Sequence, residues 1–196
     1  MGMEYERKFR AEEAVQQQLL VCLAGERAEY RMKTVYYDTP SMAIGSRKWT
    51  LRCRMENGVA VCTLKTPGEG NIRGEWETEE GEITQAIDKL CKLGAPEELA
   101  LLCREGLRPV CGAEFTRTAI TLIHGTSTLE VAVDRGILTG GSRTAPICEV
   151  EVELKTGSIS DADAFARQLA QQFSLTEEPL SKVQRALALV KGESYV

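Results

Sequence analysis

The sequence predicts an α+β fold in which antiparallel β-strands close into a barrel and the helices pack on its outside. Three observations lead to this prediction. Period-2 alternation of charged and apolar residues runs through much of the chain, as expected of strands with two different faces. The charges are sorted by strand, with acids on some strands and bases on others. The amphipathic stretches between strands carry apolar stripes that need a surface to bury against.

The first half of the chain is predicted to form five strands and one helix. The second strand ends at the turn residues Asp38-Thr39-Pro40. The predicted strands cover residues 3–10, 29–37, 49–56, 59–66 and 72–79, and the helix covers 12–24.

The dipeptide Asn57-Gly58 lies between two alternating runs and is a strong hairpin signal. A two-residue turn fixes the strand register. One face of the hairpin is then apolar, and the other presents Arg52, Arg54 and Lys65. The register pairs Arg54 with Val61, Arg52 with Thr63, Thr50 with Lys65, and Cys53 with Cys62.

The second half of the chain alternates helices and strands. Ser160 with Asp163 resembles a capping box and is predicted to start one helix, and Ser181 with Gln184 is predicted to open the last one. The other predicted elements are helices over 84–93 and 96–105, and strands over 113–123, 127–134 and 145–155.

Carboxylates form rows along several of these strands. In the strand around 147–155, Glu149, Glu151 and Glu153 share one face, with about 6.5–7 Å between successive members, while apolar residues fill the other face. Other strands repeat the pattern. The further charged members are Glu4, Glu6, Lys8, Arg73, Glu75, Glu77 and Asp134.

Two architectures would bury the apolar faces of these strands. A β-sandwich would leave the charged faces in solvent. A barrel would enclose them, and it also explains why acids and bases lie on different strands and what the helices cover. Because unpaired buried charge is too costly, such an interior must hold water, metal and a polyanion. We favour the barrel.

The composition is typical of a soluble globular protein. The 196 residues are 43% hydrophobic and carry a net charge of −5, which argues against nucleic-acid binding through bulk electrostatics. No apolar run approaches the roughly 18 residues of a membrane span, and the charged N-terminus does not resemble a signal peptide. We expect one cytoplasmic domain over residues 1–196, without a membrane partner, and leave a homodimer open.

The seven cysteines include no C-x-x-C pair, and without an export signal reduced thiols are favoured. Cys53 and Cys62 face each other in the predicted hairpin and lie near enough for a strained cross-strand bridge, so that alternative stays open.

The residue types of the predicted interior suit a metal-bound polyphosphate. Clustered carboxylates suit hard cations such as Mg²⁺ or Mn²⁺, and arginine and lysine suit phosphate oxygens. The lone His124 cannot build a histidine-rich zinc site, and the phosphate-binding loop and nucleophile-elbow motifs are absent. Any catalysis must therefore come from carboxylates, lysine and arginine.

At these residues the sequence resembles the CYTH proteins, also called triphosphate tunnel metalloenzymes. The segment EYERK at 4–8 matches their E-x-E-x-K signature, and the resemblance covers nearly the whole chain. The stretches around 115–136 and 146–157 look most like bacterial inorganic triphosphatases. Many of these carry a C-terminal helical CHAD domain, which we expect this chain to lack. The other matching segments are YYDTP at 36–40, LRCR at 51–54, TLK at 63–65, RGEWE at 73–77, FTRTA at 115–119, DRG at 134–136, PICEVEVELKTG at 146–157 and SKVQRAL at 181–187.

The resemblance implies an eight-stranded antiparallel tunnel that binds a triphosphate together with Mg²⁺ or Mn²⁺. The catalytic residues that it implies are Glu4, Glu6, Lys8, Glu75 and Glu77, the last two serving a second metal or its waters. The implied triphosphate-binding residues are Lys8, Arg52, Arg54, Lys65, Arg73, Arg117 and Lys182. The implied metal ligands are Glu4, Glu6, Asp134, Glu149, Glu151 and Glu153.

The expected activity is metal-dependent hydrolysis of a small-molecule triphosphate, above all inorganic tripolyphosphate to pyrophosphate and phosphate. An adenylyl cyclase of the same fold is one alternative; it would need a purine and ribose site, and the sequence shows no obvious aromatic clamp for one. The other alternative is a non-catalytic module that binds polyphosphate or a nucleotide. The full acidic set argues against this module, because binding alone could use the basic residues.

Overall fold

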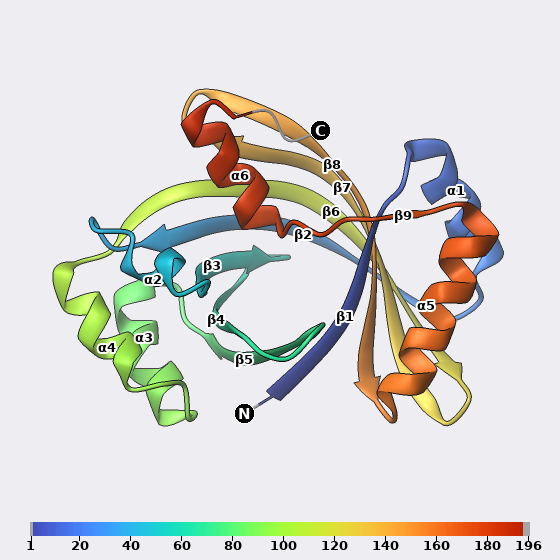
Figure 1. Cartoon of the computed structure of the whole chain (residues 1–196), viewed down its shortest axis with the longest axis horizontal. Coiled ribbons are helices and arrows are strands. Elements are labelled where there is room, and N and C mark those ends of the chain that lie inside the picture. The colour runs from blue at the N-terminus through green and yellow to red at the C-terminus, as the bar shows by residue number, and fades with distance from the viewer. Residues whose placement is uncertain (1, 194–196) are drawn as a thin grey trace.

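The computed structural model describes residues 2–193 and shows eight antiparallel strands closed into a barrel (Figure 1). The strands pair in the order β5-β4-β3-β2-β6-β7-β8-β1, and β1 also pairs with β5. The predicted eight-stranded antiparallel barrel is therefore confirmed. The strands are β1 (Gly2–Arg10), β2 (Glu26–Asp38), β3 (Thr50–Glu56), β4 (Val59–Pro67), β5 (Ile72–Glu79), β6 (Arg108–His124), β7 (Ser127–Gly140) and β8 (Arg143–Thr156).

Strand β1 closes the barrel by changing partners along its length. Its first half pairs with β5, where Glu4 lies opposite Arg73. Its second half pairs with β8, where Glu6 lies opposite Glu153 and Lys8 opposite Glu151. The charged N-terminal strand therefore lies between two other charged strands.

Helices cover two outer faces of the barrel. Helices α1 (Glu13–Cys22) and α5 (Ile159–Phe173) pack on the apolar outer face of β1, β7 and β8, around Phe9, Val150 and Val152. The second group packs on the outer face of β3, β4 and β5, around Leu51, Leu64 and other apolar residues. It consists of α2 (Ala43–Ser46), α3 (Ile83–Lys92), α4 (Glu98–Leu102) and the 3₁₀ turn η1 (Cys103–Glu105).

The last helix, α6 (Lys182–Lys191), differs from the prediction that all helices lie outside. Its buried Ala186 and Leu189 pack with Met32, Phe115 and other residues of the inward faces of the strands. In Figure 1, α6 lies beside the arc of β6, β7 and β8 and apart from α1 and α5. Strands β6–β8 extend further than predicted, and their apolar ends supply an inner surface that the helix covers. The two-residue strand β9 (Thr176–Glu177) pairs with β1 on the way to α6.

The β3–β4 hairpin has the predicted register, with Arg52 opposite Thr63 and Cys53 opposite Cys62. Asn57 and Gly58 have φ angles of 49° and 96°, so both adopt the left-handed conformation that a tight hairpin turn requires. Both cysteine thiols are free and donate to the carbonyl of Glu80.

Several predicted boundaries move by a few residues. Helix α5 is capped by Ser158, which accepts a hydrogen bond from the Asp161 amide at 3.2 Å, so the predicted Ser160 cap was wrong. The reason is Gly157: its φ of 109° ends β8 and turns the chain into the helix two residues earlier than predicted. The predicted helix 96–105 is shortened to α4 and the 3₁₀ turn. No helix in the described part of the chain is long and apolar enough to cross a membrane.

Candidate active site in the tunnel

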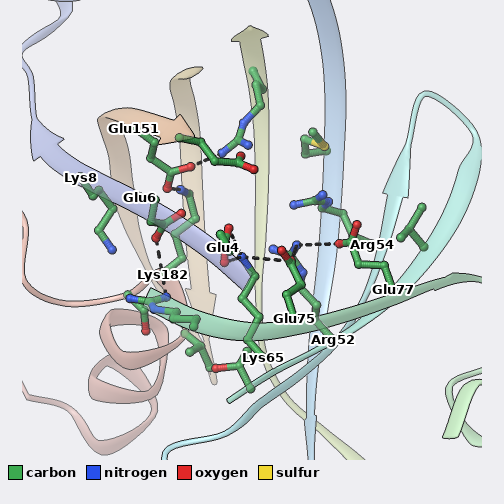
Figure 2. Close-up of a pocket in the computed structure, with 18 of the residues that line it drawn as sticks. Glu4, Glu6, Lys8, Arg52, Arg54, Lys65, Glu75, Glu77, Glu151 and Lys182 are labelled. Atoms are coloured by element: carbon green, nitrogen blue, oxygen red, sulfur yellow. Dashed lines mark hydrogen bonds and ion pairs between the residues drawn. The ribbon is translucent and has the colours of Figure 1, made fainter. Parts of the chain in front are cut away.

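The inward faces of the strands enclose a cavity of about 290 Å³ that is lined mainly by charged side chains (Figure 2). Acids and bases are balanced in number among the described lining residues. The acids are Glu4, Glu6, Glu56, Glu75, Glu77, Glu130, Glu151 and Glu153. The bases are Lys8, Arg52, Arg54, Lys65, Arg73, Arg117, Lys155 and Lys182.

The β3–β4 hairpin supplies a basic wall. Arg52, Arg54 and Lys65 project inward because the alternation of β3 and β4 puts Leu51 and Leu64 on the outer face. Burial lowers the pKa of Arg54, and the neighbouring charge of Arg52 lowers it further. Two guanidinium groups that share a partly desolvated wall repel each other, so this wall favours an anion.

Carboxylates of β1 and β5 face this wall. Lys65 donates to both carboxylate oxygens of Glu4 at 2.6 Å and lies 3.2 Å from Glu75. The guanidinium of Arg52 lies 3.6 Å from Glu77. Burial alone would raise the pKa of Glu77, but the charge of Arg52 and a hydrogen bond from a threonine hydroxyl lower it overall, so this carboxylate stays ionised.

Lys8 differs from the other cations of the tunnel. Among the described residues it forms no ion pair within 4 Å, although its side chain lines the cavity. Burial lowers its pKa to about 8, and the charges of Glu151 and Glu6 offset only part of that effect. Its ammonium is therefore available to an incoming anion.

A second charged group lies behind the cavity surface, where β7, β8 and α6 meet. Asp134 and Glu149 are fully buried there, and Glu151 reaches the cavity. Arg117 donates to both oxygens of Asp134, at 2.8 and 2.7 Å, and also contacts Glu151. Lys182 lies 2.7–2.8 Å from one oxygen of each of the three carboxylates.

The structure brings thirteen of the fifteen predicted site residues to the cavity surface, and the other two, Asp134 and Glu149, lie directly behind it. Sequence reasoning left out several members of the site. Glu56, Glu130 and Lys155 share the inward alternation of their strands and could have been found from it. Arg185 contacts Glu149 and follows Lys182 by three residues on one helix face.

A second cavity of about 290 Å³ adjoins the tunnel and shares Thr50, Lys65 and Arg73 with it. Trp49 and Tyr37 lie in its lining, so an aromatic surface is present that the sequence did not reveal. The loop before β3 supplies much of this cavity.

Asp38 orders that loop. Its carboxylate accepts hydrogen bonds from the backbone amides of Thr39, Ile44 and Gly45 at 2.7, 2.9 and 2.9 Å. Lys48 lies later in the same loop, lines the cavity and has a left-handed φ of 58°.

A model of the CYTH domain matches residues 2–187. The chain belongs to the CYTH family. It is 29% identical over 156 residues to an inorganic triphosphatase of Haemophilus influenzae, a match that covers 79% of this chain and 44% of that protein. The chain thus spans less than half the length of this relative.

Solved structures share the CYTH fold. A putative adenylyl cyclase from Hippeastrum, described as having a dominant triphosphatase activity, aligns with a TM-score of 0.65 at 15% identity, over 100% of this chain and 98% of that one. A protein from Pyrococcus horikoshii aligns with a TM-score of 0.62 at 20% identity, over 96% and 99% of the two chains. At these identities the similarity establishes the fold.

The CYTH family is metal-dependent, and the donor set behind the tunnel fits a hard divalent cation. Asp134, Glu149 and Glu151 each offer a carboxylate oxygen, and these oxygens lie within 4.8 Å of one another. Oxygen ligands without thiolate or imidazole suit Mg²⁺ and Mn²⁺. The same carboxylates form ion pairs with Arg117 and Lys182, so an entering cation has to compete with these basic side chains.

Proposed function

We propose that this CYTH protein is a metal-dependent triphosphatase that hydrolyses inorganic tripolyphosphate to pyrophosphate and phosphate. The observation that carries the proposal is the arrangement of charge in one enclosed tunnel. A crowded basic wall on β3 and β4 faces carboxylates on β1 and β5, and oxygen donors suited to a hard cation lie beside it. The similarity to the Haemophilus enzyme supports the same reaction class.

The basic side chains bind and orient the substrate in this proposal. Arg52, Arg54 and Arg117 contact the phosphate oxygens, since guanidinium groups bind them through paired hydrogen bonds. The ammonium of Lys8 adds a contact that needs no existing ion pair to break. Phosphoryl transfer depends mainly on such positioning and on charge neutralisation.

The chemistry proceeds by direct attack of water. A divalent cation held by the carboxylates behind the tunnel neutralises charge on the phosphate oxygens when it is bound. Water attacks the terminal phosphorus and the bond to the bridging oxygen breaks, so that orthophosphate and pyrophosphate form. Glu75 and Glu77 are the candidates to accept the water proton, since they face the basic wall and Glu77 stays ionised.

No covalent phospho-enzyme is required. His124, the only histidine of the sequence, lies at the end of β6 with its ring 5.2 Å from that of Phe165 in α5. It therefore packs on the helix-covered outside and does not activate a tunnel nucleophile.

A substrate panel tests the proposal. Purified protein is incubated with tripolyphosphate, ATP or pyrophosphate in the presence of Mg²⁺ or Mn²⁺, and the products are quantified. We expect phosphate release from tripolyphosphate, its loss in EDTA, and recovery when the cation is restored. Full activity in metal-free protein would refute metal dependence, and binding of tripolyphosphate without turnover would indicate the non-catalytic module.

A second candidate is an organic triphosphate substrate, including ATP in a cyclase reaction. The adjoining cavity favours it, since Trp49 offers a surface on which a heterocycle could stack, and Lys65 and Arg73 connect that cavity to the tunnel. Formation of cyclic AMP and pyrophosphate from ATP in the same panel would select this candidate.

A further inference from the structure

The ammonium of Lys182 lies where a cation would bind. It contacts Asp134 at 2.8 Å, Glu149 at 2.7 Å and Glu151 at 2.7 Å, through one oxygen of each carboxylate. These are the three residues whose oxygens cluster tightly enough to hold a metal ion. Two cations cannot share the space between the same three oxygens, because their mutual repulsion in a buried site is large.

The charges of this buried group already balance. Asp134, Glu149 and Glu151 contribute three negative charges, and Arg117, Lys182 and Arg185 contribute three positive charges in direct contact with them. A divalent cation added to this group would leave an excess of two positive charges in a buried place. Removal of the Lys182 ammonium halves that excess, and an anion in the tunnel can neutralise the rest.

We propose that Lys182 is a built-in counter-ion of the acidic trio, and that a divalent cation enters only as Lys182 leaves for the anionic substrate. The proposal rests on the function proposed above, since the anion that receives Lys182 is the triphosphate. Its consequence is thermodynamic coupling: the metal and the triphosphate bind well together, and the metal binds poorly alone.

Lys182 is placed to make this move. It is the first residue of α6 and lines the tunnel, and its side chain retains 10% exposure. The helix itself stays anchored, because Ser181 and Gln184 form a capping box and Arg185 contacts Glu149. The flexible lysine stem can therefore swing while α6 remains in place.

Metal-binding measurements test the proposal without relying on turnover. Mn²⁺ affinity is determined by calorimetry, with and without diimidotriphosphate, a triphosphate in which NH groups replace both bridging oxygens. We expect Lys182→Met to bind Mn²⁺ alone about tenfold or more tightly than the wild type, and to show a smaller anion effect. Lys191→Met is the matched control, because it removes the same charge from the exposed end of α6 and should bind Mn²⁺ as the wild type does.

Equal Mn²⁺ affinity of Lys182→Met and wild type, both without anion, would overturn the proposal. Lys182→Gln, which keeps a hydrogen-bond donor, is the second variant if the first does not fold. If neither folds, NMR of lysine side chains in the wild type reports the same displacement. The signal of the Lys182 ammonium must shift when Mg²⁺ and diimidotriphosphate are added together. A shift with Mg²⁺ alone would refute the proposal. Failure of the triphosphatase assay with the expected Mn²⁺ affinities would instead refute the proposed function.

Discussion

At the scale of single residues, the basic wall of the tunnel places two like charges near each other. Arg54 is buried and close to Arg52, and both burial and that neighbour lower its pKa. Within the protein, Glu56 at 2.6 Å offsets part of this repulsion. A polyphosphate in the cavity would offset the remainder, because it offers several oxygens to both guanidinium groups at once.

Replacement of Arg54 by alanine is expected to lower kcat/KM for tripolyphosphate roughly 5- to 150-fold. This factor corresponds to a loss of about 1–3 kcal/mol of transition-state stabilisation, the range for a lost charge-assisted contact. Steady-state kinetics measures the change. Arg47→Ala is the matched control, because Arg47 pairs with Glu98 on the exposed surface at 2.7 Å. If both variants matched the wild type, Arg54 would have no part in substrate binding.

The pH dependence of substrate binding follows from Lys8. Its pKa of about 8 means that it is charged below this pH and neutral above it, so it loses its attraction for phosphate as the pH rises through 8. We expect KM to rise about five- to tenfold more between pH 7 and 9 in the wild type than in Lys8→Arg, whose guanidinium stays charged. The comparison removes the ionisation of the substrate itself, which both proteins experience equally. Parallel KM profiles would contradict the assignment.

Alternation along the strands predicted which single residues enter the tunnel, because side chains two apart share a face. It could not predict their partners. Lys182 was expected to hold phosphate, yet it lies against three carboxylates. That contact depends on where α6 docks, which no local pattern encodes.

At the scale of elements, two helix caps of the same type serve different regions. Ser181 accepts a hydrogen bond from the Gln184 amide at 3.2 Å at the start of α6, beside the tunnel. Ser158 accepts one from the Asp161 amide at 3.2 Å at the start of α5, on the outer face. Removing each cap in turn therefore distinguishes a general loss of stability from a specific effect on the tunnel.

Ser181→Ala and Ser158→Ala should each lower stability by about 1 kcal/mol, the usual loss for an N-cap serine, which is about 2–4 °C in melting temperature. Only Ser181→Ala should also raise KM, because its helix begins with Lys182 and borders the cavity. Thermal melts and kinetics on both variants check this. A similar KM change in both would show that lost stability alone explains it.

The hairpin was the most predictable element, since Asn57-Gly58 fixes both turn and register. Strand ends were less predictable. Strand β7 continues through Gly136 to Gly140, where the sequence loses its alternation, because the backbone pairs with β6 and β8 on both sides. At Gly136 a side chain would clash with the backbone of Glu114, so the glycine permits this close pairing.

At the scale of the whole molecule, folding and ligand binding are linked through the closed tunnel. The cavity exists only when strands from both halves of the chain surround it. If the proposed function holds, a triphosphate with its cation should bind the folded protein and not the unfolded chain, and mass action should then stabilise the fold.

A thermal melt with Ca²⁺ and tripolyphosphate at a hundredfold excess over Kd should raise the melting temperature by roughly 5–10 °C, from about 2.7 kcal/mol of added stability. Ca²⁺ with orthophosphate should raise it much less, because one phosphate cannot span the basic wall and Lys8. Equal shifts would mean that the tunnel does not recognise a triphosphate.

The closed barrel could be predicted because the charged faces needed enclosure and the apolar faces needed cover. The position of α6 could not, since its apolar stripe fits an inner surface as well as an outer one. Helix α6 packs on the inner surface because the long apolar ends of β6, β7 and β8 are exposed there for it to cover.

The pairing of β1 with β8 has a kinetic consequence. It joins segments far apart in sequence, and such contacts form late because the intervening chain must first be ordered. Glu6 and Lys8 lie in the half of β1 that pairs with β8, so we expect them to reach their places only in that final closure. We therefore expect a partly refolded population that lacks this closure to show no triphosphatase activity, however much sheet it contains. Activity regained after dilution from denaturant should follow the slowest refolding phase and lag behind the return of the circular dichroism signal.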